Sequence, residues 1–579
     1  MPLITIPKNI EGMNKSERYI LNKLKQLYML ESSISYLYLE PKIKNLTPDF
    51  ILIDPIRGVM IIEIKAWSLD YFDTINQKEV KTTTGQSLEN PAYKARRYFN
   101  TLQKIFYSTR VLIDKENHLK FRLHSIVIFT ELKKSEAIEN NIDSFFDYYP
   151  IRVLYKDELI KLELDKLFDN NIESIEFSLV DAIRSSIFPE IKISKDKKSI
   201  DERILALDIE QERFAKSLPL GHYMITGIPG SGKTVALISR AIYLSKLFPN
   251  WNILILTYNK SLKSQLIYKI EAIKNSLDIL DISIYNIEVA TFHQKAMQLS
   301  NLSPKNYRDN QEEFWRDILP NDALNYAEPI YDAILIDEYQ DFYKNWFELV
   351  LKLLKEYKDN SGKVFKNIFL AGDRLQSLYN PKELNWKKDI GLDMRGRSKL
   401  LSISYRVTKE HIELGLSILR NDKRYKEEVT KFYEEGKDIL LKNLTNNSIE
   451  ILQSNDFGIV QKLQELFLQY SYNEILLLAP TWSRVNSIKK ALPINIQYNI
   501  ISSKDIVQNK ANFTTYYSAK GIEAKVAIVI DIDKITDRKL FYVASTRAYS
   551  KLILHGENIR NSIIGEEIYN LGIKSFSFV

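Results

Sequence analysis

Short apolar runs alternate with longer segments of helical periodicity through most of this chain. Apolar runs that end in polar residues occur at 222–226, 253–260, 289–293, 333–341, 367–379 and 474–481. The segment 234–247, which follows the first run, is apolar at helical spacing. Alternating buried strands and helices favour a doubly wound parallel sheet, in which the polar strand ends gather at one edge. We therefore predict an α/β fold for the larger part of the chain.

The first part of the chain has a different pattern, in which a helix precedes a β-hairpin. Residues 14–30 are apolar at helical spacing. Two β-rich runs, 48–53 and 59–67, flank a turn that contains Pro55 and Gly58. We expect these runs to pair as antiparallel strands.

The hairpin would bring two carboxylates and a lysine together. If Ile53 pairs with Val59, Asp49 lies opposite Glu63. Lys65 then shares the face of Glu63, because side chains alternate along a strand. Two buried carboxylates are costly unless a cation accompanies them. A hard ion such as Mg²⁺ would satisfy them, polarise a phosphodiester and activate water.

The segment 227–234 fits the pattern G-x-x-x-x-G-K-[ST] of a phosphate-binding loop. Its glycines allow backbone N–H groups to approach and surround the phosphates of ATP. Lys233 would reach the β and γ oxygens, and the Thr234 hydroxyl would hold Mg²⁺. The nucleotide-binding residues expected in this loop are Gly227, Gly230, Ser231, Gly232, Lys233 and Thr234.

A second site element follows the apolar run 333–336, which delivers two adjacent carboxylates. Asp337 would hold Mg²⁺, and Glu338 would orient the attacking water.

Two arginines, Arg406 and Arg547, lie far from the loop in sequence. They suit a cleft between two lobes in which each lobe supplies a cation to the transition state.

Composition bounds these expectations. At 579 residues the chain is long enough for about three or four domains. Its net charge of +7 permits a polyanionic partner without demonstrating one. The absence of cysteine excludes disulfides and thiolate metal sites. No signal peptide and no apolar run of about 18 residues is apparent, so we expect a cytoplasmic protein with no membrane partner.

Segments of the second part, taken in order, resemble the motif series of UvrD/Rep-like superfamily 1 helicases over about residues 205–560. The matching residues are Gln211, the loop 227–234, Asp337-Glu338-x-Gln340-Asp341, Gly372-Asp373-x-x-Gln376-Ser377, Tyr405-Arg406, Ala519-Lys520-Gly521-x-Glu523 and Thr546-Arg547-Ala548. The resemblance implies two RecA-like lobes, ATP and Mg²⁺ as cofactors, and DNA as partner.

The same resemblance implies roles for particular residues. Gln211 and Tyr405 would contact adenine, and Glu523 would lie near the ribose. Gln376, Arg406 and Arg547 would contact the γ-phosphate. On the path of a single strand of DNA it implies Thr257, Asn259, Thr291, His293 and Tyr379.

The first part resembles the nuclease-related (NERD) branch of PD-(D/E)XK nucleases over roughly residues 10–135. The resemblance lies in Pro48-Asp49, Glu63-x-Lys65, Glu17 on the preceding helix, Asn90-Pro91 opening a helix, and the strand 125–130. It implies that Glu17, Asp49 and Glu63 hold Mg²⁺ or Mn²⁺ and that Lys65 positions water or stabilises the transition state. Lys94 departs from the family pattern, which often has glutamine there.

These patterns predict the domain organisation. We expect a nuclease-like domain over 1–190, a charged linker over 191–205, a first RecA-like lobe over 206–398 with a small insertion near 295–330, and a second lobe over 399–579 with a reduced insertion near 409–472. Small insertions favour translocation on a single strand over processive unwinding.

The sequence therefore predicts an ATP-driven DNA motor coupled to a metal-dependent DNA nuclease. Fusions of this appearance are often associated with defence against foreign DNA, and the resemblance implies the same role here. One alternative is a DNA-binding ATPase whose first domain only docks DNA or a partner. Others are a repair helicase with an accessory nuclease and a sensor whose nucleotide state inhibits a partner nuclease. Self-association, DNA or RNA preference, and translocation polarity stay open.

Overall fold

The computed structural model describes most of the chain. The described residues are 3–7, 13–43, 46–169, 175–193, 205–206, 209–258, 260–278, 286–359, 361–376, 384–401, 407–427, 429–430, 448–502, 509–520, 522–571 and 576–578. They form two compact units. The first unit comprises Met1–Pro219, Ile238–Pro249 and Ile270–Tyr285, and the second comprises Leu220–Leu237, Asn250–Lys269 and Asn286–Val579.

The first unit contains a six-stranded sheet of mixed direction in the order β1-β2-β3-β4-β8-β9. Its strands are Leu3–Ile6, Ser35–Leu39, Phe50–Asp54, Gly58–Lys65, Leu123–Phe129 and Arg152–Leu154. The expected hairpin is β3–β4, and its register pairs Ile53 with Val59, the pairing on which the expected cluster of Asp49 and Glu63 depends. Strand β4 also pairs in parallel with β8, so β4, which contains Glu63 and Lys65, is an inner strand of the sheet.

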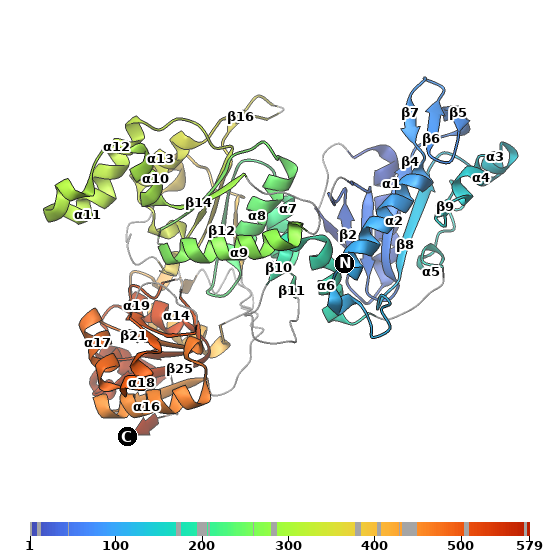
Figure 1. Ribbon diagram of the computed structural model, residues 1–579. Helices are drawn as coiled ribbons and strands as arrows, with labels where there is room; N and C mark the ends of the chain where they lie inside the picture. Colours follow the sequence, from blue (N-terminus) through green and yellow to red (C-terminus); the bar gives the residue numbers. More distant parts are fainter. Residues whose placement is uncertain are drawn as a thin grey trace. The chain divides into compact units, whose positions relative to one another are not determined.

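Helices cover both faces of this sheet (Figure 1). Helix α1 (Lys15–Leu27) packs Leu24 against a face that includes Ile62 and Ile126, and helix α2 (Pro91–Tyr107) packs Ala95 against a face that includes Val127. Ile126 and Val127 are neighbours on opposite faces, which is the two-residue period of a strand. Smaller elements are α3 (Lys134–Glu139), α4 (Asp143–Asp147), α5 (Leu164–Leu167), α6 (Phe177–Ile187), and a three-stranded sheet of β5 (Phe72–Ile75), β6 (Glu79–Thr82) and β7 (Ser87–Glu89).

Helix α7 (Ile209–Ser217) belongs to this first unit through a buried ionic cluster. Arg184 on α6 donates from Nε to the Tyr38 hydroxyl at 3.0 Å and from Nη1 to Asp181 at 2.9 Å. Its remaining nitrogen binds Glu212 on α7. Lys216 donates to the other oxygen of Glu212 at 3.0 Å. Glu212 is fully buried and Arg184 is 2% exposed, so each charge depends on the other.

This grouping differs from the expected boundaries. The segment expected as a linker, 191–205, includes β10 (Lys192–Ile193), which pairs with β11 (Leu205–Ala206), and residues 194–204 lie outside the described part. Helix α7, expected at the start of the first RecA-like lobe, is grouped with the first unit instead. The buried pairing of Arg184 with Glu212 links α7 to α6, and the expected start of the first RecA-like lobe at 206 stays a prediction.

The second unit contains two parallel sheets. The first has the order β14-β13-β15-β18-β12-β19, with strands Ile287–Thr291, Ile253–Thr257, Ala333–Asp337, Ile368–Gly372, His222–Gly227 and Ser398–Leu401. Helix α8 (Lys233–Leu247) begins after β12, and α9 (Lys260–Asp278) follows β13. This is the doubly wound arrangement that the strand pattern predicts.

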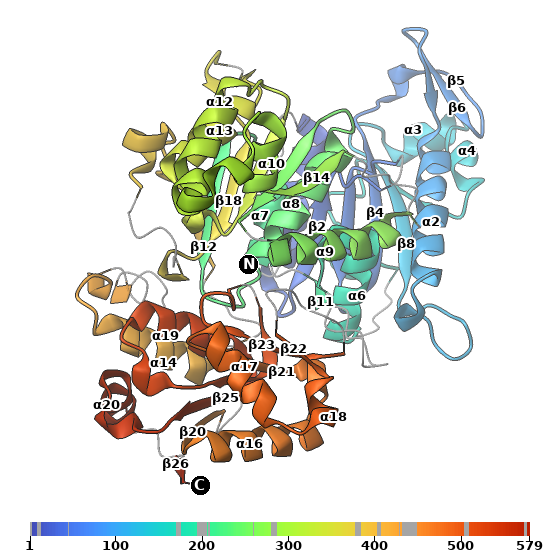
Figure 2. The ribbon, with the colours of Figure 1, turned by 60° about the vertical axis from the view of Figure 1, so that its left-hand side comes forward.

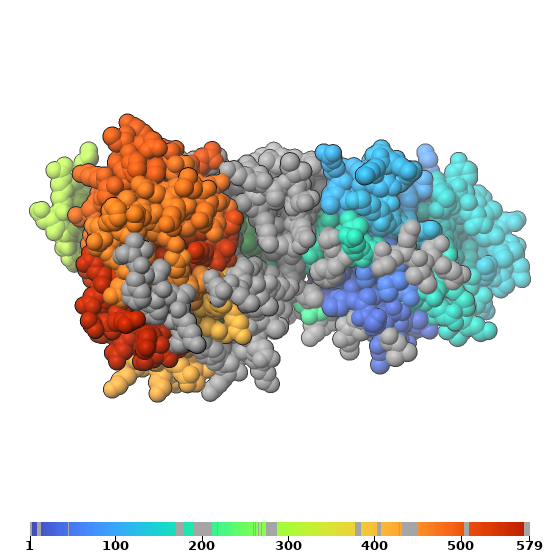
Figure 3. All heavy atoms as spheres, turned by 90° about the horizontal axis from the view of Figure 1, so that it is seen from below, coloured from blue at the N-terminus to red at the C-terminus, as the bar shows by residue number. Residues whose placement is uncertain are grey.

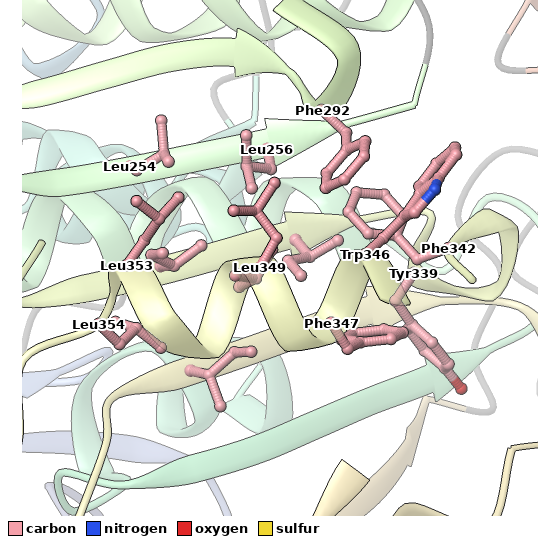
Figure 4. Close-up of a cluster of buried hydrophobic side chains, with 14 of the residues drawn as sticks. Leu254, Leu256, Phe292, Tyr339, Phe342, Trp346, Phe347, Leu349, Leu353 and Leu354 are labelled. Carbon is pink, nitrogen blue, oxygen red and sulfur yellow. The ribbon is translucent and has the colours of Figure 1, made fainter. Parts of the chain in front are cut away.

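One face of this first sheet packs against helix α13 (Lys344–Leu353), as Figure 4 shows. Leu349 and Leu353 of α13 lie against Leu254 and Leu256 of β13 in one buried cluster. Helices α10 (Phe292–Leu299) and α12 (Leu319–Asn325) contribute Phe292, Ala296, Leu319 and Ala323 to the same cluster, whereas α11 (Gln311–Glu313), which precedes a π-helical turn at Phe314–Ile318, has no buried residue. The segment 295–330, expected as a small insertion, is therefore largely helical in the described structure.

The second sheet has seven parallel strands in the order β22-β23-β21-β24-β25-β20-β26. They are Ile500–Ile501, Ala511–Thr515, Ile475–Ala479, Ala524–Val529, Ala548–Gly556, Ile449–Gln453 and Phe576–Phe578. One face packs on α14 (Lys409–Arg420), α19 (Arg538–Ser545) and α20 (Ile563–Asn570), and the other on α16 (Asp456–Gln469) and α17 (Trp482–Ala491). Figure 2 shows these two layers, and Figure 3 shows this lobe in orange and red.

The expected insertion over 409–472 differs from the structure in its described parts. Strand β20 lies within the sheet, where Ile451 pairs with Leu554 of β25, and helix α16 covers the same sheet. Helix α14 packs on the opposite face. These segments are core elements because their apolar residues are buried in the lobe; residues 431–447 lie outside the described part.

Among the described helices, none is both long enough and apolar enough to span a membrane.

The ionic cluster on α7 yields a stability prediction. Arg184→Ala leaves Glu212 buried with fewer cationic partners, and breaking a buried pair costs about 3–5 kcal/mol. We expect thermal unfolding of the full chain to show a clear loss of stability. Arg97→Ala is the matched control, because Arg97 is 47% exposed and pairs with Glu89 at the surface. Equal melting temperatures for the two variants would contradict a structural role for the cluster.

Candidate functional site

The phosphate-binding loop lies between β12 and α8, as predicted. Gly230 and Gly232 have φ of 73° and 80°, values that favour glycine. A side chain on Gly227 would lie 2.6 Å from the carbonyl oxygen of Leu401, so this position requires close backbone approach. The Lys233 ammonium donates to the carbonyls of Gly227 and Ile228 at 2.9 and 3.0 Å. The loop therefore has the backbone shape and the cation that phosphate binding needs.

The two residues expected to hold Mg²⁺ in the motor lie together. The Thr234 hydroxyl donates to Asp337 Oδ2 at 2.9 Å. Burial and the neighbouring Glu338 carboxylate together raise the pKa of Asp337 to about 7. A hydroxyl and a carboxylate are the oxygen ligands that Mg²⁺ prefers. The donor set at this position therefore fits the ion.

Glu338, the expected water-orienting residue, has a strained backbone. Its φ is 55°, in the left-handed region, which costs about 1–3 kcal/mol in a residue other than glycine. The Gln340 amide donates to the Glu338 carboxylate, and the Gln340 carbonyl oxygen accepts from Asp373 N at 3.1 Å. Gly372 makes room for this amide, because a Cβ there would lie 2.1 Å from Gln340 Oε1. Gln340 thus links the ends of β15 and β18.

A buried ion pair joins the two lobes of the second unit. The Lys520 ammonium donates to both oxygens of Asp341, at 2.8 and 2.7 Å, and to the Gln376 carbonyl at 2.8 Å. Lys520 and Asp341 are each 1% exposed. Burial raises the pKa of Asp341 to about 6, and Lys520 opposes that rise. Neither residue was assigned a site role from the sequence, although both lie in quoted motifs.

A second contact joins the lobes beside the first. Arg547 Nη2 donates to Gln376 Oε1 at 3.0 Å, and its Nε donates to the Val543 carbonyl at 2.8 Å. The Tyr542 hydroxyl donates to Asp373 at 3.3 Å. The structure therefore brings together Gln376 and Arg547, two of the three residues expected at the γ-phosphate.

Four further residues are expected at the nucleotide: Gln211, Tyr405, Arg406 and Glu523. Tyr405 and Arg406 lie outside the described residues. Gln211 is on α7 in the first unit and is 1% exposed. Glu523 is half-buried just before β24. Their roles at the nucleotide stay predictions.

The residues expected on the path of single-stranded DNA are mostly buried. Thr257 is fully buried, and Thr291 caps helix α10 by accepting from Gln294 N at 3.2 Å. His293 lies among aromatic rings, with Trp346 at 4.8 Å, and burial lowers its pKa to about 4. Asn259 and Tyr379 lie outside the described residues. The role of His293 on the path of DNA stays a prediction, as does that of the other four residues.

In the first unit, Glu63 is the centre of the expected nuclease site. It is fully buried at the end of β4, and its Oε1 accepts from Lys65 at 2.6 Å and from Lys94 at 2.6 Å. Its other oxygen, Oε2, is buried and has no hydrogen-bond partner within the described structure. Such an orphaned carboxylate oxygen is a ready ligand for a hard cation.

Asp49 lies beside Glu63, as the hairpin register predicts. Its Oδ2 accepts from Ile64 N at 2.5 Å. Burial and the Glu63 carboxylate raise the pKa of Asp49 to about 7, against the opposing effect of Lys65. The four charged groups, Asp49, Glu63, Lys65 and Lys94, thus form one cluster.

Glu17 does not join this cluster in the structure. Its carboxylate accepts from Asn14 N at 3.0 Å and closes the capping box of α1. Across the described residues, no three side chains of His, Cys, Asp or Glu are grouped as metal ligands. The expected set of three carboxylates is therefore reduced to Asp49 and Glu63, because the helix cap engages the third.

The ion pair between the lobes yields a prediction. Lys520→Met strands the buried Asp341 carboxylate and should cost about 3 kcal/mol or more. The double variant Lys520→Met with Asp341→Asn should recover part of that loss in thermal melts. Lys525→Met is the control, since Lys525 is 40% exposed and pairs with Glu474 at 3.2 Å. Additive effects of the two substitutions would contradict direct coupling.

Comparison with known proteins agrees with this geometry. A model of the nuclease-related domain (NERD) matches residues 13–130, and a model of the UvrD/REP helicase N-terminal domain matches residues 207–315. The chain is also 28% identical over 165 residues to a probable DNA helicase II homolog of Mycoplasma capricolum subsp. capricolum. That match covers 27% of this chain and only 21% of the relative. Two separate segments of the chain are therefore similar to a nuclease-related domain and to the N-terminal domain of UvrD/REP helicases.

Proposed function

We propose that this protein is an ATP-driven DNA motor coupled to a metal-dependent DNA nuclease, and that it acts against foreign DNA in the cytoplasm. The main support for the motor is that side chains from its two lobes contact each other just beyond the ends of strands β15 and β18. Lys520 meets Asp341, which follows the carboxylates Asp337 and Glu338 in the same segment, and Arg547 meets Gln376. Groups from two lobes that converge there can respond to the presence or loss of a γ-phosphate.

In this mechanism the loop backbone and Lys233 bind the phosphates, and Thr234 with Asp337 holds Mg²⁺. Bound Mg²⁺ neutralises charge on the phosphates and orients them. Glu338, held by Gln340, orients the attacking water. Gln376 and Arg547 stabilise charge at the transferred phosphate and transmit its loss to the second lobe.

The nuclease part of the proposal is supported by the cluster at the end of β4. Asp49 and the orphaned Oε2 of Glu63 would hold a divalent cation, which when bound polarises a phosphodiester. Lys65 would orient the water or stabilise charge on the phosphate. The fit is partial, because Glu17 caps its own helix and Lys94 already binds Glu63.

That partial fit favours one second candidate, a DNA-binding ATPase whose first domain only docks DNA or a partner. In that case the two lysines on Glu63 neutralise the cluster permanently, and metal has no role. The similarity to a probable DNA helicase II homolog of Mycoplasma capricolum subsp. capricolum supports a helicase and does not distinguish repair from defence.

The motor part predicts a specific loss of ATP turnover. Lys233→Ala removes a cation from the phosphate site, and we expect ATPase turnover stimulated by single-stranded DNA to fall at least about 100-fold. Lys344→Ala is the control, because Lys344 is 56% exposed on α13 of the same lobe. DNA-stimulated turnover that survives Lys233→Ala would exclude this loop as the hydrolytic site.

The nuclease part predicts metal-dependent cleavage of end-labelled single-stranded and plasmid DNA with Mg²⁺ or Mn²⁺. Lys65→Ala and Glu63→Gln should each lower cleavage at least about 100-fold. Lys81→Ala, an exposed lysine on β6, should cleave like the wild type. Intact DNA with the wild-type protein under every condition would reduce the first domain to a docking module.

A further inference from the structure

Two ammonium groups share one oxygen of the buried Glu63. Lys65 comes from the same strand, two residues away, and binds Glu63 Oε1 at 2.6 Å. Lys94 comes from helix α2 and binds the same oxygen at 2.6 Å. The motif Glu63-x-Lys65 accounts for the first lysine and leaves the second unexplained.

Lys94 is held toward Glu63 by the first turns of α2. Asn90 caps the helix by accepting from Ala92 N at 2.9 Å, and Ala95 is fully buried against the sheet. The Lys94 ammonium lies 5.5 Å from the Tyr98 ring, a favourable cation–π distance. The Tyr98 hydroxyl in turn donates to the Thr47 carbonyl at 3.0 Å. The helix thus directs this ammonium at a carboxylate on the neighbouring strand.

The cluster is close to electrically neutral without any metal. When ionised, Asp49 and Glu63 supply two negative charges, and Lys65 and Lys94 supply two positive charges. A divalent cation at Asp49 and Glu63 Oε2 would therefore lie beside two like charges within a few ångströms, and such repulsion weakens binding. Lys94 is 29% exposed, whereas Glu63 is fully buried, so the lysine is the group that can withdraw toward water.

We propose that Lys94 competes with a divalent cation for Glu63 and thereby sets the metal affinity of the nuclease-related domain. The cation binds Glu63 Oε2 and Asp49 as the Lys94 ammonium leaves Oε1. Lys65 stays, because it lies on the same strand as Glu63. This inference rests on the proposed nuclease function, and it makes Lys94 a residue that restrains metal loading.

The test is titration of the nucleotide-free, full-length protein with Mn²⁺, followed by the electron paramagnetic resonance signal of unbound Mn²⁺. Lys94→Gln removes the charge and keeps a polar side chain of similar length. We expect its Mn²⁺ dissociation constant to fall at least about tenfold, which corresponds to about 1.4 kcal/mol. Asp49→Asn identifies Mn²⁺ bound elsewhere, and thermal melts show that each variant is folded.

Two control variants separate charge from structure. Lys94→Arg keeps the positive charge and should bind Mn²⁺ as weakly as the wild type. Lys104→Gln removes an exposed lysine from the same helix, away from Glu63, and should also match the wild type. Metal binding, unlike cleavage, is unaffected by any defect in DNA handling.

The outcomes separate this inference from the nuclease proposal. Tighter Mn²⁺ binding in Lys94→Gln, but not in the two control variants, supports both the competition by Lys94 and the metal site of the proposed nuclease. Equal affinity in Lys94→Gln and wild type, with Asp49→Asn losing the site, overturns competition by Lys94 and leaves the metal site standing. If no folded variant shows Mn²⁺ binding that depends on Asp49, both the competition and the metal-dependent nuclease are wrong.

Discussion

Burial of carboxylates at the ends of strands is the constraint on which this structure depends. Glu63 lies at the end of β4 and Asp337 at the end of β15, and both are almost completely buried. A buried charge is costly unless a cation or hydrogen-bond donor meets it. In the first unit lysines meet Glu63, and in the second unit the Thr234 hydroxyl meets Asp337. Each candidate site is thus organised around a carboxylate that needs a partner.

The same constraint explains how distant segments are held together. Lys520 reaches Asp341 across 179 residues of sequence, and Arg184 reaches Glu212 across 28. The first pair joins the two lobes of the second unit, and the second joins helices α6 and α7. Such pairs add little net stability relative to apolar packing, but losing one partner is expensive. Each pair therefore favours one arrangement of the segments that it joins, and replacing one partner leaves the other buried without its counter-charge.

Much of the fold follows from local patterns. The P-loop required glycines at Gly230 and Gly232, the β3–β4 register followed from apolar runs around a turn, and Asn90 and Pro91 open α2 as expected. The parallel sheets followed from apolar runs with polar ends. Local patterns were sufficient because each of these features is decided by neighbours in sequence.

Long-range pairings were not predictable in the same way. Glu17 is expected from resemblance at the metal, yet its carboxylate closes the box with Asn14, three residues away. Lys94 stands where the family often has glutamine, but nothing in the sequence shows that it binds Glu63. The link between α6 and α7 depends on Arg184, a residue that belongs to none of the recognised sequence motifs. These features depend on which side chains meet in space.

The central claim is that the motor and the nuclease-related domain work as one machine, and the most direct measurement is cleavage of a long end-labelled DNA with Mg²⁺, with and without ATP. Wild type would be compared with Glu338→Gln, which should bind ATP but turn it over slowly. The account predicts that ATP changes the rate or position of cleavage by wild type and that Glu338→Gln lacks this change. Identical cleavage patterns with and without ATP in the wild type would contradict it.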